Sequence, residues 1–534
     1  MNTQRAWLER GVGAVLLCGF ALYWLRGFAA LPPSDFDDAY MVLRYVRHVL
    51  DGHGLAWNVG EPPVYGVTSR LHFAWVLVLR LLFPSLSSAE LLRVASGAVA
   101  VALVVAMPLA ASLLGRPRRF SLALWTVLLV PAFAFTEFFR FHSSSGMDTQ
   151  LSALANLLVA LAAYRLCRMP SPGAVTVSVI AGYVAVLARP ENAVPALLCP
   201  LLAVCFFAPV AKPRLIGQLV FSTLALWLLD AGLCARFLGT PVPLAFYAKR
   251  PGYYAQFAGE HGWNPYWFLQ VFLQASWPAW VATLAFTRRR NFKRVLVLLS
   301  PVLVLMVALS MFNQIMGHMG RFYAPLLPFV VLAGAKAVDE IPWGPRVLSR
   351  TYVWLSLRLT AALGVQYFAL WALLTLGQAR EDHAPPMLAL PSDLPNEGVG
   401  DFPEQDSWTA ARAMGRLMTW SPAGTVFAMS EHGLPGALAP GVPILDLLGL
   451  HDSHVARVGF SASALFRRGP DVLWMPHPDH VGMWRDIVAN REFQQEYIFF
   501  RDAFYYGVAV RKHSRMFAAW PSLMLRMGIP WPAR

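Results

Sequence analysis

Long apolar stretches separated by short polar loops dominate the first 377 residues of this chain. Most of them reach roughly 17–25 residues, the length that a helix needs to cross the hydrocarbon core of a bilayer. Backbone groups that face lipid find no water to bond, so each stretch is expected to be helical. The pattern predicts a polytopic α-helical membrane protein with about 11 transmembrane helices. The expected spans are 11–30, 91–114, 120–139, 150–168, 174–189, 192–211, 216–237, 264–286, 294–312, 322–338 and 351–377.

Two apolar stretches differ from the rest. Residues 11–30 follow Arg5 and Arg10 and resemble a signal peptide. The run is longer than a usual signal core of about 7–15 residues, so we expect an uncleaved anchor helix. Residues 71–83 are shorter and contain Arg80. We expect them to form a helix at the membrane interface or half inside it.

Lysine and arginine are concentrated in alternate loops, which predicts the orientation. Cytoplasmic loops carry an excess of basic residues. The N-terminus is therefore expected to be cytoplasmic, and the loops that hold 31–90, 140–148, 189–192, 238–263 and 313–321 are expected outside. An odd number of spans also puts the residues from about 378 onward outside. The basic loops are 115–119, 165–168, 211–214, 287–294 and 344–350.

The last 157 positions have a different character, so we divide the chain into a transmembrane module, 1–377, with a first outer loop at 31–90, and a tail, 378–534. The tail begins with a Pro- and acid-rich linker. Short β-branched and aromatic runs bounded by Gly and Pro then predict strands. We expect a small extracytoplasmic α/β domain. Its expected strands lie within 425–430, 443–450, 471–476 and 504–512, and its helices within 408–420 and 483–495.

Composition agrees with this class of protein. Of the 534 residues, 57% are hydrophobic and 14% are charged, against about a quarter charged in an average soluble domain. The net charge of +14 falls mostly in loops between apolar stretches. Membrane topology explains that distribution better than nucleic-acid binding does. None of the five cysteines lies after Cys234, so no disulfide can form within the tail.

Asp37 and Asp38, at the start of a short predicted helix, are the strongest candidates for chemistry. One interpretation is structural, because acids favour a helix N-terminus and Ser34 could cap it. The other is catalytic, because a positioned carboxylate can act as a general base toward a hydroxyl. Tyr40 and Arg44 share a helical face with Asp37. A Gly- and Pro-rich loop follows, with His53 and Asn58 among its polar residues.

Further candidates come from later segments expected on the same outer side. Basic groups there could bind a lipid phosphate, and a carboxylate inside an apolar helix is costly unless it is paired. The alternatives are helix capping, local ion pairs and side chains reaching toward lipid headgroups. The candidates for phosphate binding are Arg44, Arg189, Lys249 and Arg321; those for substrate binding are Tyr40, His53, Asn58, Glu137, Asp148, Glu191, His318 and His432.

Motifs for several other chemistries are absent from the sequence. It contains no phosphate-binding P-loop, dinucleotide-binding motif, GxSxG or HExxH, so nucleotide hydrolysis and zinc peptidase activity have no support. We expect no cofactor. The acidic pair Asp37 and Asp38 is the one candidate ligand set for a divalent cation.

The stretch 36–71, "FDDAYMVLRYVRHVLDGHGLAWNVGEPPVYGVTSRL", resembles the first outer loop of polyprenyl-phosphate-dependent glycosyltransferases of the GT-C class. Within that class it resembles the arabinofuranosyltransferase group, which includes the terminal arabinofuranosyltransferase of mycobacterial walls and the pilin arabinosyltransferases. Four later segments extend the resemblance: "SGMDTQL" (145–151), "ARPENAVPALL" (188–198), "RFYAPLLPF" (321–329) and "ILDLLGLHD" (444–452).

The resemblance implies a GT-C fold and a pentosyltransferase. Its donor would be a polyprenyl-phosphate-linked pentose, in particular arabinofuranose, and its acceptor a cell-envelope glycan or glycoprotein. Asp37 and Asp38 would carry the catalytic carboxylate, on the outer face of a bacterial inner membrane. Two other functions stay open: a flippase or transporter of lipid-linked saccharides, for which Asp230 and Arg358 are the residues to check, and a scaffold that binds wall polymer.

Overall fold

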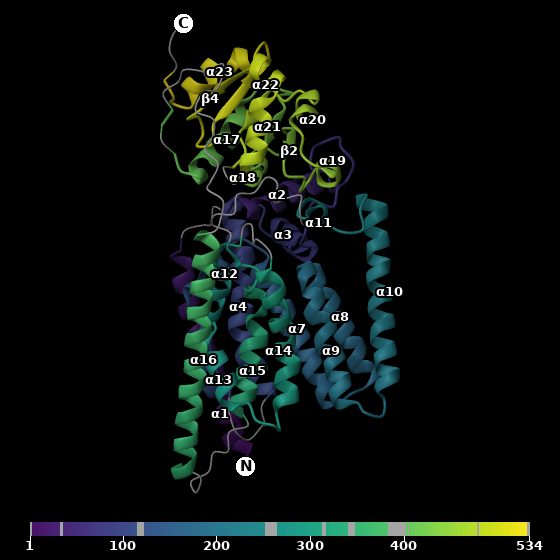
Figure 1. Cartoon of the computed structure of the whole chain (residues 1–534), viewed down its shortest axis with the longest axis vertical. Coiled ribbons are helices and arrows are strands. Elements are labelled where there is room, and N and C mark those ends of the chain that lie inside the picture. The colour runs from purple at the N-terminus through teal and green to yellow at the C-terminus, as the bar shows by residue number, and fades with distance from the viewer. Residues whose placement is uncertain are drawn as a thin grey trace.

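The computed structural model describes residues 3–31, 36–114, 122–250, 264–311, 317–339, 348–382, 402–403, 405–477 and 480–530. A bundle of long helices forms one end of an elongated molecule, and a mixed sheet with short helices forms the other (Figure 1). Helices α2 (Asp37–Leu50), α3 (Arg70–Leu82) and α11 (Leu244–Ala248) lie between the two parts. Helix α1 begins at the free end of the bundle, and α23 (Arg515–Arg526) lies at the far end of the sheet region.

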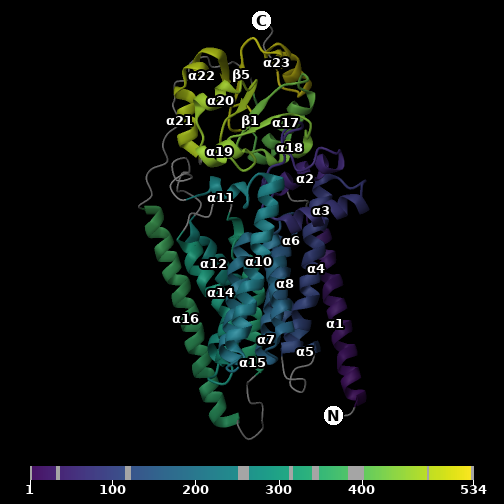
Figure 2. The same ribbon diagram turned by 90° about the vertical axis from the view of Figure 1, so that its right-hand side faces the viewer.

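Helices of the bundle fall where the apolar stretches predicted them. The first and last, α1 and α16, run along its outside (Figure 2). The helices are α1 (Thr3–Ala29), α4 (Ser88–Leu114), α5 (Leu122–Ala134), α6 (Glu137–Ser144), α7 (Thr149–Arg168), α8 (Pro172–Ala188), α9 (Ala193–Phe207), α10 (Lys212–Leu238), α12 (Pro265–Ala275), α13 (Trp277–Phe286), α14 (Phe292–Ser310), α15 (Leu327–Asp339) and α16 (Leu348–Asp382), with short 3-10 turns η1 (Pro190–Asn192), η3 (His318–Gly320) and η4 (Ala324–Leu326).

Within the described residues, eight helices are long and apolar enough to cross a membrane, or nine if the bent pair α5 and α6 is one span. This is a polytopic helical membrane protein. Two other expected spans are α8, which is shorter, and residues 264–286, which divide into α12 and α13 at Ser276. Pro278 in the first turn of α13 accounts for that break, because proline has no N–H to donate and its ring clashes with the carbonyl four residues earlier. The count of eleven spans stays a prediction.

The end of the expected span 120–139 differs from the prediction. The chain turns by 74° between α5 and α6. Thr136 caps the new helix by accepting a hydrogen bond from the Phe139 amide, as a threonine before a helix commonly does. Glu137 therefore lies in the first turn of a separate short helix and is exposed. It is not a carboxylate inside an apolar span.

The C-terminal part contains a five-stranded sheet with the order β2-β1-β3-β5-β4. Strands β2, β1 and β3 run parallel to each other, and β5 is antiparallel to both β3 and β4. Strands occur in all four stretches that predicted them, and β4 was not predicted. The elements are α17 (Ser407–Trp420), β1 (Phe427–Met429), α18 (Gly433–Leu438), β2 (Ile444–Asp446), α19 (Ser453–Val458), α20 (Ala462–Arg467), β3 (Val472–Trp474), α21 (Val481–Ala489), α22 (Arg491–Glu496), β4 (Tyr497–Phe500), β5 (Val508–Arg511) and α23 (Arg515–Arg526).

Helix α2 belongs to the core of the sheet region although it lies close to the N-terminus. One hydrophobic cluster contains Leu43, Tyr45 and Trp57 together with Phe427 and Trp474 of the sheet. A second large cluster fills the helix bundle. Acids in the first turn of α2 and basic residues in its last turn suit the helix dipole. Position 34, the expected cap, lies outside the described residues, and Phe36 precedes the helix.

Candidate functional site

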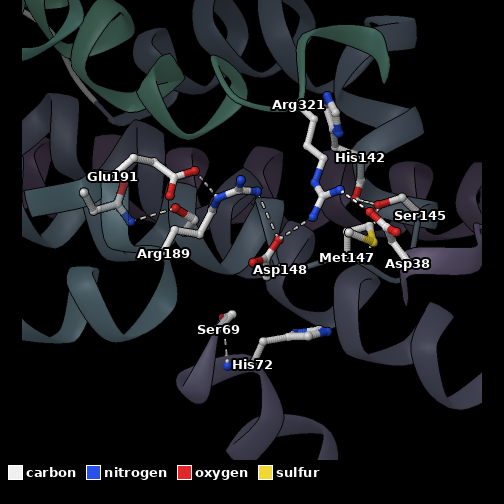
Figure 3. Close-up of polar contacts among 12 residues, drawn as sticks. Asp38, Ser69, His72, His142, Ser145, Met147, Asp148, Arg189, Glu191 and Arg321 are labelled. Atoms are coloured by element: carbon white, nitrogen blue, oxygen red, sulfur yellow. Dashed lines mark hydrogen bonds and ion pairs between the residues drawn. The ribbon is translucent and has the colours of Figure 1, made fainter. Parts of the chain in front are cut away.

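Five charged side chains form a continuous chain of ion pairs at the junction between the helix bundle and the sheet region (Figure 3). Arg321 lies 3.0 Å from Asp38 and 3.8 Å from Asp148, measured from guanidinium nitrogen to carboxylate oxygen. On the other side of Asp148, Arg189 approaches at 3.1 Å and continues to Glu191 at 2.6 Å. We call these five residues the charged cluster.

Separate elements bring these side chains together. Asp38 lies in the first turn of α2, and Asp148 occupies the N-cap position of α7. Helix α8 ends at Arg189, whose backbone is extended because Pro190 follows it. Glu191 then lies in the short turn η1. The paired residues Asp38 and Arg321 are 283 positions apart in the sequence, so only the tertiary fold creates the cluster.

Arg321 follows a turn in which two residues have left-handed backbone angles: Met319 has φ 50° and Gly320 φ 64°. A Cβ at Gly320 would lie 2.9 Å from the backbone oxygen of Phe268, so this position requires glycine. The ring of His142, in α6, contacts the Met319 oxygen at 2.9 Å. These contacts fix the turn and therefore the direction of the Arg321 side chain.

Burial differs along the cluster and indicates which side a ligand could approach. The side chains of Arg189 and Asp148 are nearly inaccessible, whereas Asp38 is 20% exposed and Glu191 is 24% exposed. Asp148 therefore acts as a buried anion between two guanidinium groups. The two outer carboxylates are the accessible members, and Asp38 is the accessible acid of α2.

The charge of Asp148 is maintained by its neighbours. Burial alone would raise the pKa of this carboxyl, but Arg189, Arg321 and His72 together hold it below its ordinary value. The ring of His72, in α3, contacts the Gly146 oxygen at 3.2 Å. His72 and His142 are parts of this region that the sequence analysis missed, since a single histidine in an apolar helix carries no spacing signal.

Lys249, which directly follows α11, supplies a further positive charge to this region. The residue has exposed surface, but burial lowers the pKa of its ammonium, while Asp38 acts in the opposite direction. It lies within electrostatic reach of Asp38, Glu191, Arg321 and Arg189. An ammonium close to two guanidinium groups can neutralise an incoming anion, and charge-assisted hydrogen bonds of this kind are the strong ones.

Asp37, expected to be catalytic, has a different environment from Asp38. It is 3% exposed, and its two oxygens accept hydrogen bonds from the amides of Gly433 and Leu434 at 2.9 and 2.7 Å. Burial raises the pKa of Asp37, while these amides act in the opposite direction. Burial and the nearby Asp37 also raise the pKa of Tyr40 to about 12. The expectation that Asp37 shares the catalytic role is corrected, because both of its oxygens anchor α18.

Arg44 is also a structural residue, which corrects its expected contact with a phosphate. Its guanidinium is fully buried and lies 4.7 Å from the centre of the Trp57 ring. A guanidinium carries five N–H donors, and this one makes five hydrogen bonds of 2.7 to 3.3 Å, which leaves no donor for a ligand. The acceptors are the backbone oxygens of Trp57, Gly436, Ala439 and Val442 and the side-chain oxygen of Asn58.

The remaining expected residues are scattered. His53 is exposed in the loop after α2. His318 is exposed and its ring lies 5.3 Å from that of Phe36. Asn58 is buried and bonds to both backbone groups of Ile444. His432 is completely buried, so it cannot touch a substrate as expected. None of these four side chains is part of the ion-pair chain defined above.

The expected cation site at the acidic pair does not fit the geometry. Both oxygens of Asp37 already accept amide hydrogens, and Asp38 points to Arg321 instead. Among the residues that the structure describes, no group of three or more His, Cys, Asp or Glu could hold a metal ion. We derive no step through a metal at this pair.

No protein-family model matches the sequence, and no curated protein matches it. Solved structures of an oligosaccharyltransferase from Archaeoglobus fulgidus are similar to this chain at low sequence identity. Its apo form is 14% identical with a TM-score of 0.39, over 82% of this chain and 65% of that one. The complex with Zn and sulfate is 13% identical with a TM-score of 0.38, over 80% and 62%.

A third structure is the same kind of enzyme, AglB of Archaeoglobus fulgidus, in complex with an inhibitory peptide and a dolichol-phosphate. It is 13% identical to this chain with a TM-score of 0.41, and the match covers 86% of this chain and 69% of that one. This chain therefore spans less than two thirds of the first two structures and slightly more of the third.

Proposed function

We propose that this chain is a membrane glycosyltransferase of the GT-C class that uses a lipid-linked sugar donor. The observation that carries the proposal is the pair Asp38 and Arg321, 3.0 Å apart, beside Arg189 and Lys249. A partly exposed carboxylate next to three cations, at the end of a helix bundle, suits transfer from a donor with an anionic leaving group.

The cations would bind the donor phosphate. Guanidinium groups match phosphate oxygens with paired hydrogen bonds, and the Lys249 ammonium adds a mobile point charge. The leaving group gains negative charge as its bond to the sugar breaks, so fixed cations at this place lower the barrier. Asp148 already orients Arg189 and Arg321 before a donor arrives.

Asp38 would act as the general base. An acceptor hydroxyl attacks the anomeric carbon, a new C–O bond forms, the bond to the phosphate oxygen breaks, and the hydroxyl proton passes to the Asp38 carboxylate. Polyprenyl phosphate leaves with the electron pair. A bound phosphate competes for Arg321 and so releases Asp38 for this task. General-base catalysis of this type contributes about 10²–10⁴-fold to the rate.

The finer identity of the substrates comes from the family resemblance of the first outer loop. We propose a polyprenyl-phosphoryl pentose, in particular arabinofuranose, as the donor and a cell-envelope glycan or glycoprotein as the acceptor. The reaction would take place on the outer face of a bacterial inner membrane. Glu137, Glu191 and His318, which are all at least partly accessible, remain candidates for contacts with sugar hydroxyls.

Asp230, the acidic residue in α10, does not support the alternative function as a transporter. Asp230 lies 2.5 Å from Arg70 and accepts a hydrogen bond of 2.9 Å from the Tyr183 hydroxyl. These contacts connect α10 to α3 and α8, which gives the carboxylate a structural role. An ion pair of this kind explains why a charge is tolerated in that helix.

The test uses purified protein in lipid nanodiscs with a synthetic polyprenyl-phosphoryl arabinofuranose that carries a radiolabelled sugar, and an arabinan oligosaccharide as acceptor. We expect labelled product from the wild type and a loss of about 10²–10⁴-fold in Asp38→Asn. Asp51→Asn is the matched control, because Asp51 lies at the end of the same helix in an exposed pair with Arg47. Full activity of Asp38→Asn would refute the assigned mechanism; movement of intact donor across vesicles without product would favour the transporter.

A further inference from the structure

A histidine and an aspartate of the sheet region lie directly behind the acids of α2. His432 precedes α18, and its Nε2 atom lies 3.0 Å from Oδ1 of Asp446 at the end of β2. The two oxygens of Asp446 also accept amide hydrogen bonds from Leu448 and His451, at 2.8 and 2.6 Å. This carboxylate is therefore fixed on both sides, and it fixes the imidazole in turn.

The same short segment binds the acidic pair. Asp37 accepts its two hydrogen bonds from Gly433 and Leu434, the residues that directly follow His432. The imidazole also lies within electrostatic reach of both Asp37 and Asp38. One carboxylate thus bonds the histidine ring, and two more from a distant part of the chain act on its charge.

The ring is closed off from solvent. His432 is completely buried beside the stacked rings of Trp57 and His451, whose centres are 5.2 and 4.9 Å away. Its second nitrogen, Nδ1, has no hydrogen-bond partner within the described part of the chain. A group in this place cannot contact donor or acceptor, and it can act on the reaction only through its neighbours.

We infer that His432 and Asp446 are a positioning pair, which places a positive charge behind Asp37 and thereby holds Asp38 in place as the base. This inference rests on the proposed transferase function and gives the C-terminal sheet region a part in it. Two adjacent carboxylates repel each other, and each disfavours the charge of the other. An imidazolium next to Asp37 removes that conflict and leaves Asp38 as the one accessible base.

The pH dependence follows from the groups that face the ring: Asp446 from β2, Asp37 and Asp38 from α2, and His451 from the loop after β2. Burial lowers the pKa of His432, but Asp446, Asp37 and Asp38 together raise it above its ordinary value of 6.5. The imidazolium therefore persists above that pH and is lost as the pH rises through the raised pKa. Transfer should fall in the same range.

The experiment measures kcat and donor KM against pH for the full-length protein in nanodiscs, with the labelled polyprenyl-phosphoryl arabinofuranose and the arabinan acceptor. In His432→Gln we expect kcat to fall on the order of tenfold, the usual scale for a residue that orients a functional group. The fall of kcat at alkaline pH should also be absent in this variant, because glutamine does not titrate. Donor KM should stay unchanged, since the cations are untouched. His454→Gln is the matched control, because His454 is exposed on the same region.

Each result decides one question. Absence of product from the wild type refutes the proposed function itself. An active wild type whose His432→Gln variant keeps the wild-type kcat and the alkaline decline overturns the positioning role alone. Should that variant fail to fold, the wild type still gives a test: a kcat that stays level through the alkaline range contradicts the inference. Asp446→Asn, which weakens the same hydrogen bond, is expected to shift the decline to lower pH.

Discussion

Asp37 and Asp38 are neighbours in one helical turn, yet the structure gives them opposite environments. Successive residues of a helix point about 100° apart, so one side chain of the pair can face the sheet region while the other faces the bundle. Asp37 bonds to two amides of α18, and Asp38 pairs with Arg321. The sequence could indicate an important acidic pair, but only the position of α18, almost 400 residues later, decides which acid is accessible.

At Gly433, the contact between α18 and α2 leaves no room for a larger side chain. A Cβ at that position would lie 2.0 Å from the backbone oxygen of Asp37. We expect Gly433→Ala to push α18 away from α2 and to lower the free energy of unfolding by about 1–3 kcal/mol, as overpacked sites usually do. Thermal unfolding followed by tryptophan fluorescence measures the change.

The control for this substitution is Gly441→Ala in the same region, where a new Cβ would meet no atom within 4 Å. Both changes add one methyl group and neither position has a positive φ. Equal unfolding temperatures for the two variants would mean that α18 does not press against α2.

At the scale of elements, periodicity and turn residues predicted most of the fold. The helices of the bundle and four strands follow from local sequence. The breaks at Thr136 and Ser276 were missed because apolar residues continue through them. Strand β4, Tyr497–Phe500, was missed because it follows α22 without a turn residue between them. Pairing with β5 makes it a strand, and such a tertiary contact leaves no local signal.

The site was predictable only in part, for a related reason. The basic loops indicated that Asp148, Arg189, Glu191, Lys249 and Arg321 share one side of the membrane, and the structure brings them together. A shared side of the membrane, however, does not reveal which basic residue binds a ligand and which one has a structural role. Arg44 carries the same charge and lies on the same side, but its donors are all used inside the protein.

Arg44 is one of the residues that attach helix α2 to the sheet region, through the oxygens of Gly436, Ala439 and Val442, and it gives an element-scale prediction. Lysine offers three donors from one point, against five in a fixed plane for arginine. In Arg44→Lys at least two of the five buried acceptors lose their partner, at about 1–3 kcal/mol for each. We expect a lower unfolding temperature and faster limited proteolysis of the sheet region.

Arg47→Lys is the control for that experiment, because Arg47 is on the same helix with a side chain that is 63% exposed. Its pair with Asp51 should contribute little to stability. If Arg44→Lys unfolds at the same temperature as Arg47→Lys, the five hydrogen bonds are not what attaches α2.

For the whole molecule, the two hydrophobic clusters do not follow the order of the sequence. The core of the sheet region includes α2 and Trp57, which precede most of the bundle in sequence. His48 adds to this interface through ring contacts with the backbone oxygens of Ala56 and Pro440, at 2.8 and 2.9 Å. The sheet region is therefore completed by α2 and Trp57, and its position relative to the charged cluster is set by that shared core.

A protease site inserted between residues 382 and 402 tests this arrangement. After cleavage, we expect the C-terminal fragment to remain bound to the membrane fragment during gel filtration in detergent, because separation would expose the shared apolar core and leave the bonds of Arg44 and Asp37 unmade. Cleaved Gly433→Ala should release more of the fragment than cleaved Gly441→Ala, since only the first weakens the contact between α18 and α2. A wild-type fragment that elutes alone after cleavage would contradict a shared core. It would also remove the physical link by which the sheet region could align Asp38.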